Sequence, residues 1–277
     1  MVKKLVCTTA LLVALAFLFT GLALAQRPAP TATIHEQGLQ MPSGGNRTVP
    51  PGLVPAFCSP CLFYGGDGDP SNINADGLWD NNSSFFGIAA QVYSPFVVPK
   101  KTDKCGGTCK WGVSGLFVAL ELNPFIAGTG PAVTPSDAVW AVYSAGVAAG
   151  GSPLSATKAC SGTDTAPTFT DTGRLYFGIY EEFAMNVKVT GCTLAGTKSG
   201  ATFWEQVTPE FPATGFQLSY ESNVPDIPAP NAFGPAEPAD QSFFYGPAFG
   251  FTSFTNANML GPFHLFSAGV EGTLVKK

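Results

Sequence analysis

Residues 111–122 read WGVSGLFVALEL, and this stretch decides the fold that the sequence predicts. Side chains alternate along it with a period of two, which is the pattern of a β-strand. One face is expected to carry Trp111, Val113, Gly115, Phe117, Ala119 and Glu121, and the other Leu116, Val118, Leu120 and Leu122. Because both faces are largely apolar, the stretch predicts a central strand that is covered on both sides.

Seven further apolar or alternating stretches are separated by clusters of Gly, Pro, Asn and Asp. They span residues 85–98, 138–146, 174–189, 201–207, 215–221, 241–254 and 263–275. No stretch combines helical spacing with a cap and good helix formers, and 32 glycines and 24 prolines would interrupt most helices. The sequence therefore predicts an all-β fold, a β-sandwich or jelly-roll-like domain of about eight to ten strands.

Residues 1–25 have the pattern of a secretory signal peptide. Lys3 and Lys4 precede a long apolar run, and Ala23 and Ala25 form a small-x-small cleavage site. An uncleaved membrane anchor is the alternative, because the apolar run is nearly long enough to span a bilayer. The small residues favour cleavage, and no second apolar run of spanning length follows. We therefore expect a secreted protein, extracellular or periplasmic.

Residues 26–57 are rich in Pro, Gly, Thr and Ser, which predicts a flexible arm before a single β-sandwich domain of residues 58–277. Removal of the two signal lysines leaves 12 of the 14 basic residues against 19 acidic ones, a net charge of −7. Nucleic-acid binding needs clustered Lys and Arg, so this balance argues against it. Only 12% of residues are charged and 45% are hydrophobic, which suits a large core.

Six cysteines follow the signal, and an even number in an exported chain predicts disulfides. The sequence alone leaves 15 pairings open. Local proximity favours Cys58–Cys61, Cys105–Cys109 and Cys160–Cys192.

Two other uses of these cysteines match the spacing, but their context disfavours the first and excludes the second. The first four, Cys58, Cys61, Cys105 and Cys109, have roughly the ligand spacing of a four-thiolate zinc site, although an oxidising compartment disfavours thiolates. Alternatively, Cys58-Ser59-Pro60-Cys61 has the spacing of a thioredoxin-type redox pair. That motif should follow a strand and open a helix, whereas a glycine-rich loop follows here.

The loop within residues 58–87, CSPCLFYGGDGDPSNINADGLWDNNSSFFG, is rich in Gly, Asp and Asn. Such residues close turns, and their oxygen atoms are the ligands that Ca²⁺ selects. The spacing is not that of an EF-hand, and a turn without metal is the alternative. If the loop holds a metal, the sequence predicts Ca²⁺ bound by Asp67, Asp69, Asn72 and Asp76.

The order of several motifs resembles a group of uncharacterised secreted bacterial proteins. These motifs are LFYGGDGDPSNINADGLWDNN at residues 62–82, VYSPFVVP at 92–99, WGV at 111–113 and AVWAVY at 138–143. Proteins of this group share a YFGGD-like loop, a W-x-V strand and a two-sheet sandwich domain. The resemblance covers most of residues 62–275 and implies architecture, without implying catalytic residues.

Two histidines, His35 and His264, are too few to favour a Ser-His-Asp triad or histidine-rich zinc catalysis. Glycoside hydrolysis needs only two carboxylates across a groove. The candidate acids near strands are Glu121, Glu181, Glu182, Glu205, Glu210 and Glu221. None of them forms an alternating acidic pattern on one strand, and Glu181 and Glu182 would face opposite sides of a regular strand.

Sugar binding needs only aromatic platforms and a few polar groups. The candidate platforms are Trp79, Tyr93, Trp111, Trp140, Tyr143, Trp204 and Tyr245. Trp79 is the best candidate for an exposed ligand-binding residue, because it lies in the polar loop. We therefore expect a secreted non-catalytic module that binds glycans or other cell-surface material, with a carboxylate-based glycoside hydrolase as the alternative.

The calcium hypothesis predicts a stability effect. Three carboxylates close together repel one another, so Ca²⁺ binding should raise the melting temperature by mass action. Replacing Asp67 and Asp69 together by Asn should abolish that rise without changing the calcium-free fold. Thermal melts with millimolar Ca²⁺ after chelator treatment test this, and an unchanged melt of the unmutated protein would reject the site.

Overall fold

A computed structural model of the chain describes residues 58–66, 79–81, 91–99, 110–122, 136–176, 180–197, 199–210, 218–220, 233–234, 241–247, 250–257 and 266–275. All of them belong to one compact unit of the chain, Gly38–Lys277. The expected signal peptide and arm, residues 1–25 and 26–57, lie outside the described residues.

Thirteen strands account for most of the described residues, and every pairing between them is antiparallel. They are β1 Cys61–Tyr64, β2 Trp79–Asn81, β3 Gln91–Val98, β4 Lys110–Leu122, β5 Asp137–Ala145, β6 Thr157–Asp164, β7 Thr168–Tyr176, β8 Tyr180–Ala195, β9 Ala201–Glu210, β10 Leu218–Tyr220, β11 Phe243–Gly246, β12 Phe251–Asn256 and β13 Ala268–Val275. No helix in this part of the chain is long and apolar enough to cross a membrane. The predicted all-β sandwich is confirmed, with more strands than expected.

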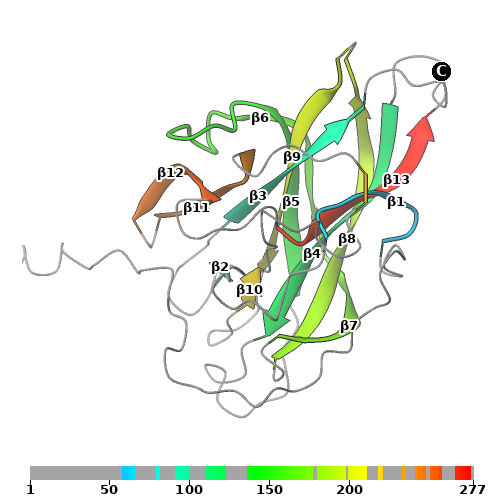
Figure 1. Ribbon diagram of the computed structural model, residues 1–277, viewed down its shortest axis with the longest axis vertical. Helices are drawn as coiled ribbons and strands as arrows, with labels where there is room; N and C mark the ends of the chain where they lie inside the picture. The colour runs from blue at the N-terminus through cyan, green and yellow to red at the C-terminus, as the bar shows by residue number, and fades with distance from the viewer. Residues whose placement is uncertain are drawn as a thin grey trace, which may run out of the picture. The chain divides into compact units, whose positions relative to one another are not determined.

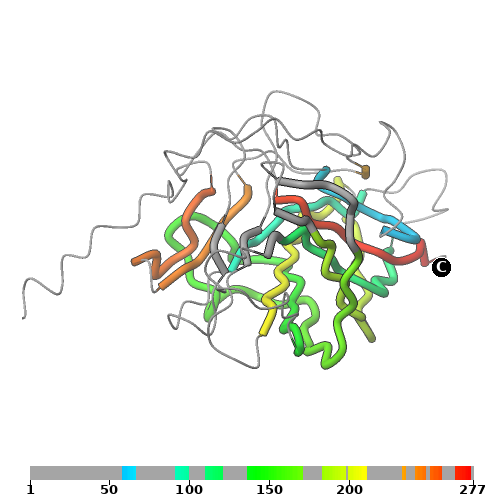
Figure 2. Tube along the Cα trace, turned by 90° about the horizontal axis from the view of Figure 1, so that it is seen from below, coloured from blue at the N-terminus to red at the C-terminus, as the bar shows by residue number. Residues whose placement is uncertain are grey.

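The strands form two sheets (Figure 1). In the seven-stranded sheet, β8 lies along one side of β4 and is itself flanked by β7. The other side of β4 pairs first with β13 and then with β10, and these two are flanked by β1 and β2 respectively. The six-stranded sheet has the order β12-β11-β3-β9-β5-β6. Figure 2 shows β1, in blue, running beside β13, in red, although they are far apart in the sequence.

Aromatic side chains from both sheets meet in the core between them. Phe96 on β3 lies 5.8 Å from Phe63 on β1, 5.8 Å from Trp111 on β4 and 5.9 Å from Phe203 on β9, measured between ring centroids. All four side chains are buried. Burial of large aromatic side chains stabilises a fold strongly, so this cluster is a main contact between the two layers.

A bulge in β4 corrects the predicted assignment of its faces. Gly115 pairs with Glu271 of β13, whereas Val113 pairs with Gly272, so β4 has one extra residue at this level. An extra residue turns the following side chains to the opposite face. Trp111 and Val113 therefore share the inter-sheet core with Leu116 and Val118, while Phe117 packs on the outer face.

The register of β8 shifts at the same level. Val187 and Val189 face the inter-sheet core, and beyond Gly191 the core residues are Cys192 and Leu194. Gly191 has a φ of 69°, in the left-handed region that glycine adopts at little cost. This shift turns Cys192 toward the six-stranded sheet, where it forms a disulfide with Cys160 on β6, at a Cα–Cα distance of 5.6 Å.

A second aromatic core covers the opposite face of the six-stranded sheet. Its buried members are Tyr93, Ala141, Tyr143, Val147, Trp204, Phe243 and Phe254. The ring of Phe254 on β12 stands edge-on to Tyr93, with centroids 4.8 Å apart. The Phe254 amide donates to the Gly151 carbonyl at 2.8 Å, and the Gly150 amide donates to the Phe254 carbonyl at 2.9 Å. The β11–β12 hairpin is thereby tied to the loop that follows β5.

Three strand predictions needed correction. Residues 174–189, predicted as one strand, contain the end of β7 and the start of β8, with Tyr176 paired to Tyr180. Residues 241–254 likewise contain the hairpin of β11 and β12. β6 is absent from the predicted strands, because TKACSGTD is a polar, mostly exposed edge strand without apolar alternation.

Removal of the inter-sheet disulfide should destabilise the domain strongly. Its cysteines are 32 residues apart, and replacing both Cys160 and Cys192 by Ala should lower the free energy of unfolding by about 3–4 kcal/mol through loop-closure entropy. Urea unfolding measures the change. The matched control replaces Cys58 and Cys61, only three residues apart, by Ala and should cost about 2 kcal/mol. Equal costs would contradict this account.

Candidate functional site

The cysteine pairings that fall on described residues are the predicted ones. Cys58 bonds to Cys61, and Cys160 bonds to Cys192. Cys105 and Cys109 lie outside the described residues, so their pairing stays a prediction. Because Cys58 and Cys61 are bonded to each other, they do not supply the thiolates of the alternative zinc site.

The predicted calcium ligands, Asp67, Asp69, Asn72 and Asp76, lie outside the described residues. Trp79 lies in β2 at the edge of the seven-stranded sheet, where it is the register partner of Tyr220 in β10. Among the residues that the structure describes, no group of three or more His, Cys, Asp and Glu side chains is placed to hold a metal ion.

Most of the other candidate aromatic platforms belong to the cores. Tyr93, Trp111, Trp140 and Tyr143 are buried, and Trp204 is only 8% exposed. The Trp204 indole also donates a 2.8 Å hydrogen bond to the Gln241 carbonyl. Tyr245 is partly exposed. Of the platforms whose burial is described, these core positions leave Tyr245 as a candidate for contact with a sugar, and Trp79 stays a prediction.

The outer face of the seven-stranded sheet carries a small cluster around the start of β1. Cys58 and Tyr64 are buried there against Phe117 of β4, with the rings of Tyr64 and Phe117 5.3 Å apart. Gly269 of β13 leaves room for the Phe117 ring, since a Cβ at this position would collide with it. Cys61 is partly exposed, and Ser59 and Pro60 are exposed.

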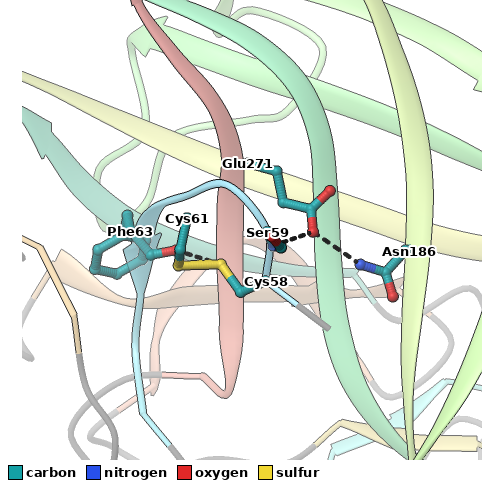
Figure 3. Close-up of a disulfide and its surroundings, with 6 residues drawn as sticks. All are labelled: Cys58, Ser59, Cys61, Phe63, Asn186 and Glu271. Carbon is teal, nitrogen blue, oxygen red and sulfur yellow. Dashed lines mark hydrogen bonds between the residues drawn. A yellow bond between two sulfur atoms is a disulfide. The ribbon is translucent and has the colours of Figure 1, made fainter. Parts of the chain in front are cut away.

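A half-buried carboxylate lies next to this disulfide. Glu271 on β13 is the register partner of Cys61 on one side and of Gly115 on the other. Its Oε1 accepts hydrogen bonds from the Ser59 amide at 3.0 Å and the Asn186 side-chain amide at 3.4 Å (Figure 3). A Cβ at position 115 would collide with the carboxylate, so glycine provides its space.

The environment of Glu271 favours its neutral form. Burial raises the pKa of this carboxyl, and the hydrogen bond from the Ser59 amide lowers it by a smaller amount. A carboxyl with a raised pKa can hold a proton under conditions where an exposed one would be ionised. Glu271 therefore combines proton-transfer capability with direct contact to the loop that carries the disulfide.

A second carboxyl, Glu205, lies inside the main core. It is 1% exposed on β9, on the same face as Phe203 and Val207. Ser94 of β3 is its register partner and is also buried. Among the described residues, neither the Glu205 carboxyl oxygens nor the Ser94 hydroxyl have a hydrogen-bond partner. Burial raises the pKa of Glu205 well above its ordinary value, which favours the neutral form of this carboxyl.

Two carboxylates face each other where β5 begins and β9 ends. Asp137 and Glu210 are register partners, and both are partly exposed. Burial is the larger cause that raises the pKa of Glu210, and the negative charge of Asp137 is the smaller one. Asp137 itself accepts a 2.8 Å hydrogen bond from the Ser136 hydroxyl. The backbone register also places Glu121 of β4 opposite Glu182 of β8.

Glu271 and Asp137 are not among the candidate acids that the sequence predicted. The signal for Glu271 was a single acidic residue inside the apolar strand AGVEGTLV. Burying a charged side chain at such a position costs more free energy than burying its apolar neighbours, so the residue is a candidate for a specific role. The remaining candidates, Glu181 and Glu182, lie near the start of β8, and Glu221 and His264 lie outside the described residues.

Comparisons of the chain with protein-family models, with curated proteins and with solved structures found no match. A function for this protein is therefore inferred from the chemistry of its own residues.

The buried Glu205 predicts an unusual dependence of stability on pH. Because its folded-state pKa is raised, the folded state binds the extra proton, and the free energy of unfolding should fall as pH rises above the carboxyl's unfolded pKa. Glu205→Met should remove this fall and raise the free energy of unfolding near pH 7 by about 1–3 kcal/mol. Urea unfolding across the pH range measures both effects.

The control is Glu205→Gln, which removes the titration but leaves polar atoms buried. It should flatten the pH dependence without the full gain in stability. A Met variant that is less stable than the original protein at every pH would show that the carboxyl has a stabilising partner.

Proposed function

We propose that this chain is an exported, non-catalytic β-sandwich module that binds glycans or other cell-surface material. The observation that carries the export is the Cys160–Cys192 disulfide, which covalently joins β6 of one sheet to β8 of the other. Disulfides of this kind form and persist in oxidising compartments such as the periplasm and the extracellular space. The signal-like residues 1–25 support the same compartment.

The environments of two carboxyls favour binding over hydrolysis. Glu205 is sealed in the core, so a substrate cannot approach it without unfolding. Glu271 is held by hydrogen bonds from Ser59 and Asn186. Hydrolysis of a glycosidic bond requires two carboxyl groups facing one sugar, and neither of these residues has an acidic register partner.

The edge formed by β2 and β10 offers the residue types that recognise sugars. Its register pairs Trp79 with Tyr220 and Asp80 with Ser219. Aromatic rings stack on sugar faces, so Trp79, on the edge strand β2, is the proposed ligand-binding residue.

A carboxylate-based glycoside hydrolase is the second candidate, favoured by the Asp137–Glu210 pair. Direct cross-strand partners have Cβ atoms roughly 4.5–5.5 Å apart, which is similar to the carboxyl separation of retaining glycosidases, about 5–5.5 Å. The pKa of Glu210 is raised beside Asp137, as expected where one carboxyl, Glu210, is the general acid and the other, Asp137, is the nucleophile.

A glycan array and hydrolysis assays on the same polysaccharides separate the two functions. We expect binding without turnover, and we expect Trp79→Ala to weaken binding by about tenfold or more through loss of stacking. Leu154→Ala changes an exposed residue in the loop between β5 and β6 and is the matched control.

Turnover would instead support the hydrolase if Glu210→Gln abolished it and the core variant Glu205→Gln did not. Binding that Trp79→Ala leaves unchanged would reject the proposed surface. The absence of both binding and turnover would reject both functions.

A further inference from the structure

The two described disulfides have different structural roles. Cys160–Cys192 connects two sheets across 32 residues, whereas Cys58–Cys61 spans three residues and connects no two elements. A disulfide constrains the unfolded chain less when the loop that it closes is short. Cys58–Cys61 therefore has the smaller structural role.

The segment around Cys58–Cys61 is also held in place by bonds that do not involve sulfur. The Gly272 amide donates to the Pro60 carbonyl at 2.9 Å, and the Ser59 amide donates to Glu271. Further along, Tyr64 pairs with Gly269 of β13 in the sheet. Opening the disulfide leaves all of these contacts available, so the site can be reduced without losing β1.

The two cysteines differ in exposure. Cys58 is 2% exposed and packs against Tyr64 and Phe117, whereas Cys61 is partly exposed beside the exposed Pro60. An external thiolate can therefore approach Cys61, and the sulfur that departs is that of Cys58. A thiolate forming in this apolar pocket is unfavourable unless it is protonated as the bond breaks.

A carboxyl that can donate this proton and a carbonyl that can accept a hydrogen bond from a thiol lie beside the loop. Glu271 is the register partner of Cys61, and it accepts a hydrogen bond from Ser59, which lies between the two cysteines (Figure 3). Burial favours its protonated form. The Phe63 carbonyl oxygen lies 3.5 Å from the sulfur of Cys61 and 3.9 Å from that of Cys58, where it can accept a hydrogen bond from either reduced thiol.

We propose that Cys58–Cys61 is a thiol–disulfide exchange site that accepts two electrons from a thiol-bearing substrate, with Glu271 as the proton donor to the departing sulfur. This activity goes beyond the binding of glycans and does not depend on it. The substrate class is a small or peptide thiol that can reach the exposed side of Cys61.

The exchange proceeds in two balanced steps. A substrate thiolate attacks the sulfur of Cys61, the S–S bond breaks, and its electron pair passes to the sulfur of Cys58, which takes a proton from Glu271. A second substrate thiolate then attacks the substrate sulfur of the mixed disulfide and releases Cys61, which takes a proton from solvent, and Glu271 regains its proton from solvent. Two substrate thiols become one disulfide, and the protein gains two thiols.

This site differs from the thioredoxin type considered in the sequence analysis. There the cysteine pair opens a helix, whose N-terminus stabilises a thiolate. Here the pair opens strand β1, and no helix follows it within the described residues. Here the Glu271 carboxyl, on the neighbouring strand β13, neutralises the departing sulfur by donating a proton.

The first test compares the reduction rates of the two disulfides within one molecule. The intact oxidised protein is treated with reduced glutathione under native conditions, and newly formed thiols are alkylated and mapped by peptide mass spectrometry. Cys58 and Cys61 should be reduced at least about tenfold faster than Cys160 and Cys192, which serve as the internal control. Equal rates, or reduction of Cys58–Cys61 only on unfolding, would overturn the proposal.

Single-cysteine variants test which sulfur is attacked. In Cys58→Ser the remaining Cys61 thiol should react with an aromatic disulfide reagent about tenfold faster than Cys58 does in Cys61→Ser. Circular dichroism melts establish that each variant is folded. Faster reaction of Cys58 would reverse the assigned roles and contradict the mechanism.

A pH profile tests Glu271. Glu271→Gln should slow reduction by about tenfold near pH 5, and the difference should shrink as pH rises and Glu271 of the unmutated protein ionises. Among the described residues, the titratable groups that the register places on this face include Tyr64 on β1, Asp80 on β2, Lys110 and Glu121 on β4, and Glu182 and Lys188 on β8. Lys188 is exposed opposite Gly115. Lys188→Gln is the control and should leave the profile unchanged. A Glu271→Gln effect that does not vary with pH would exclude proton donation.

Discussion

The register shift shared by β4 and β8 is the constraint on which both faces of the seven-stranded sheet depend. On the inner face, it places Trp111 against Phe96 and turns Cys192 toward Cys160, so that an aromatic stack and a covalent bond both join the sheets. On the outer face, it leaves Gly115 beneath the carboxylate of Glu271. Without the extra residue in β4, one end of this strand would turn its apolar side chains to the wrong face.

Two glutamates of this chain differ in whether their carboxyls have hydrogen-bond partners, and this difference gives them different roles. Glu205 is buried in the main core, where its carboxyl oxygens have no hydrogen-bond partner among the described residues, so burial raises the pKa of this carboxyl. Glu271 is only half-buried and accepts hydrogen bonds from Ser59 and Asn186, so it can exchange a proton while remaining in place. The first arrangement is a cost to the fold, and the second is suited to chemistry at the adjacent loop.

The same contrast separates the two disulfides. Cys160–Cys192 joins the edge strand β6 of one sheet to β8 of the other, and its loss would loosen the contact between the layers. Cys58–Cys61 lies at the entry to β1, where hydrogen bonds to β13 already position the backbone. The domain thus combines one bond that joins its two sheets with a second bond that closes only a short loop.

The sequence by itself determined that this protein is all-β, because alternating apolar residues and closely spaced Gly, Pro, Asn and Asp are local properties of the chain. It also identified both described cysteine pairs, although Cys160–Cys192 rested only on proximity in the sequence. The polar strand β6, the core side of Trp111 and Val113, and the meeting of Glu271 with the Cys58–Cys61 loop were decided by the tertiary structure alone. The reason is that bulges and register arise from pairing between distant strands, and β1 and β13 are about 200 residues apart along the chain.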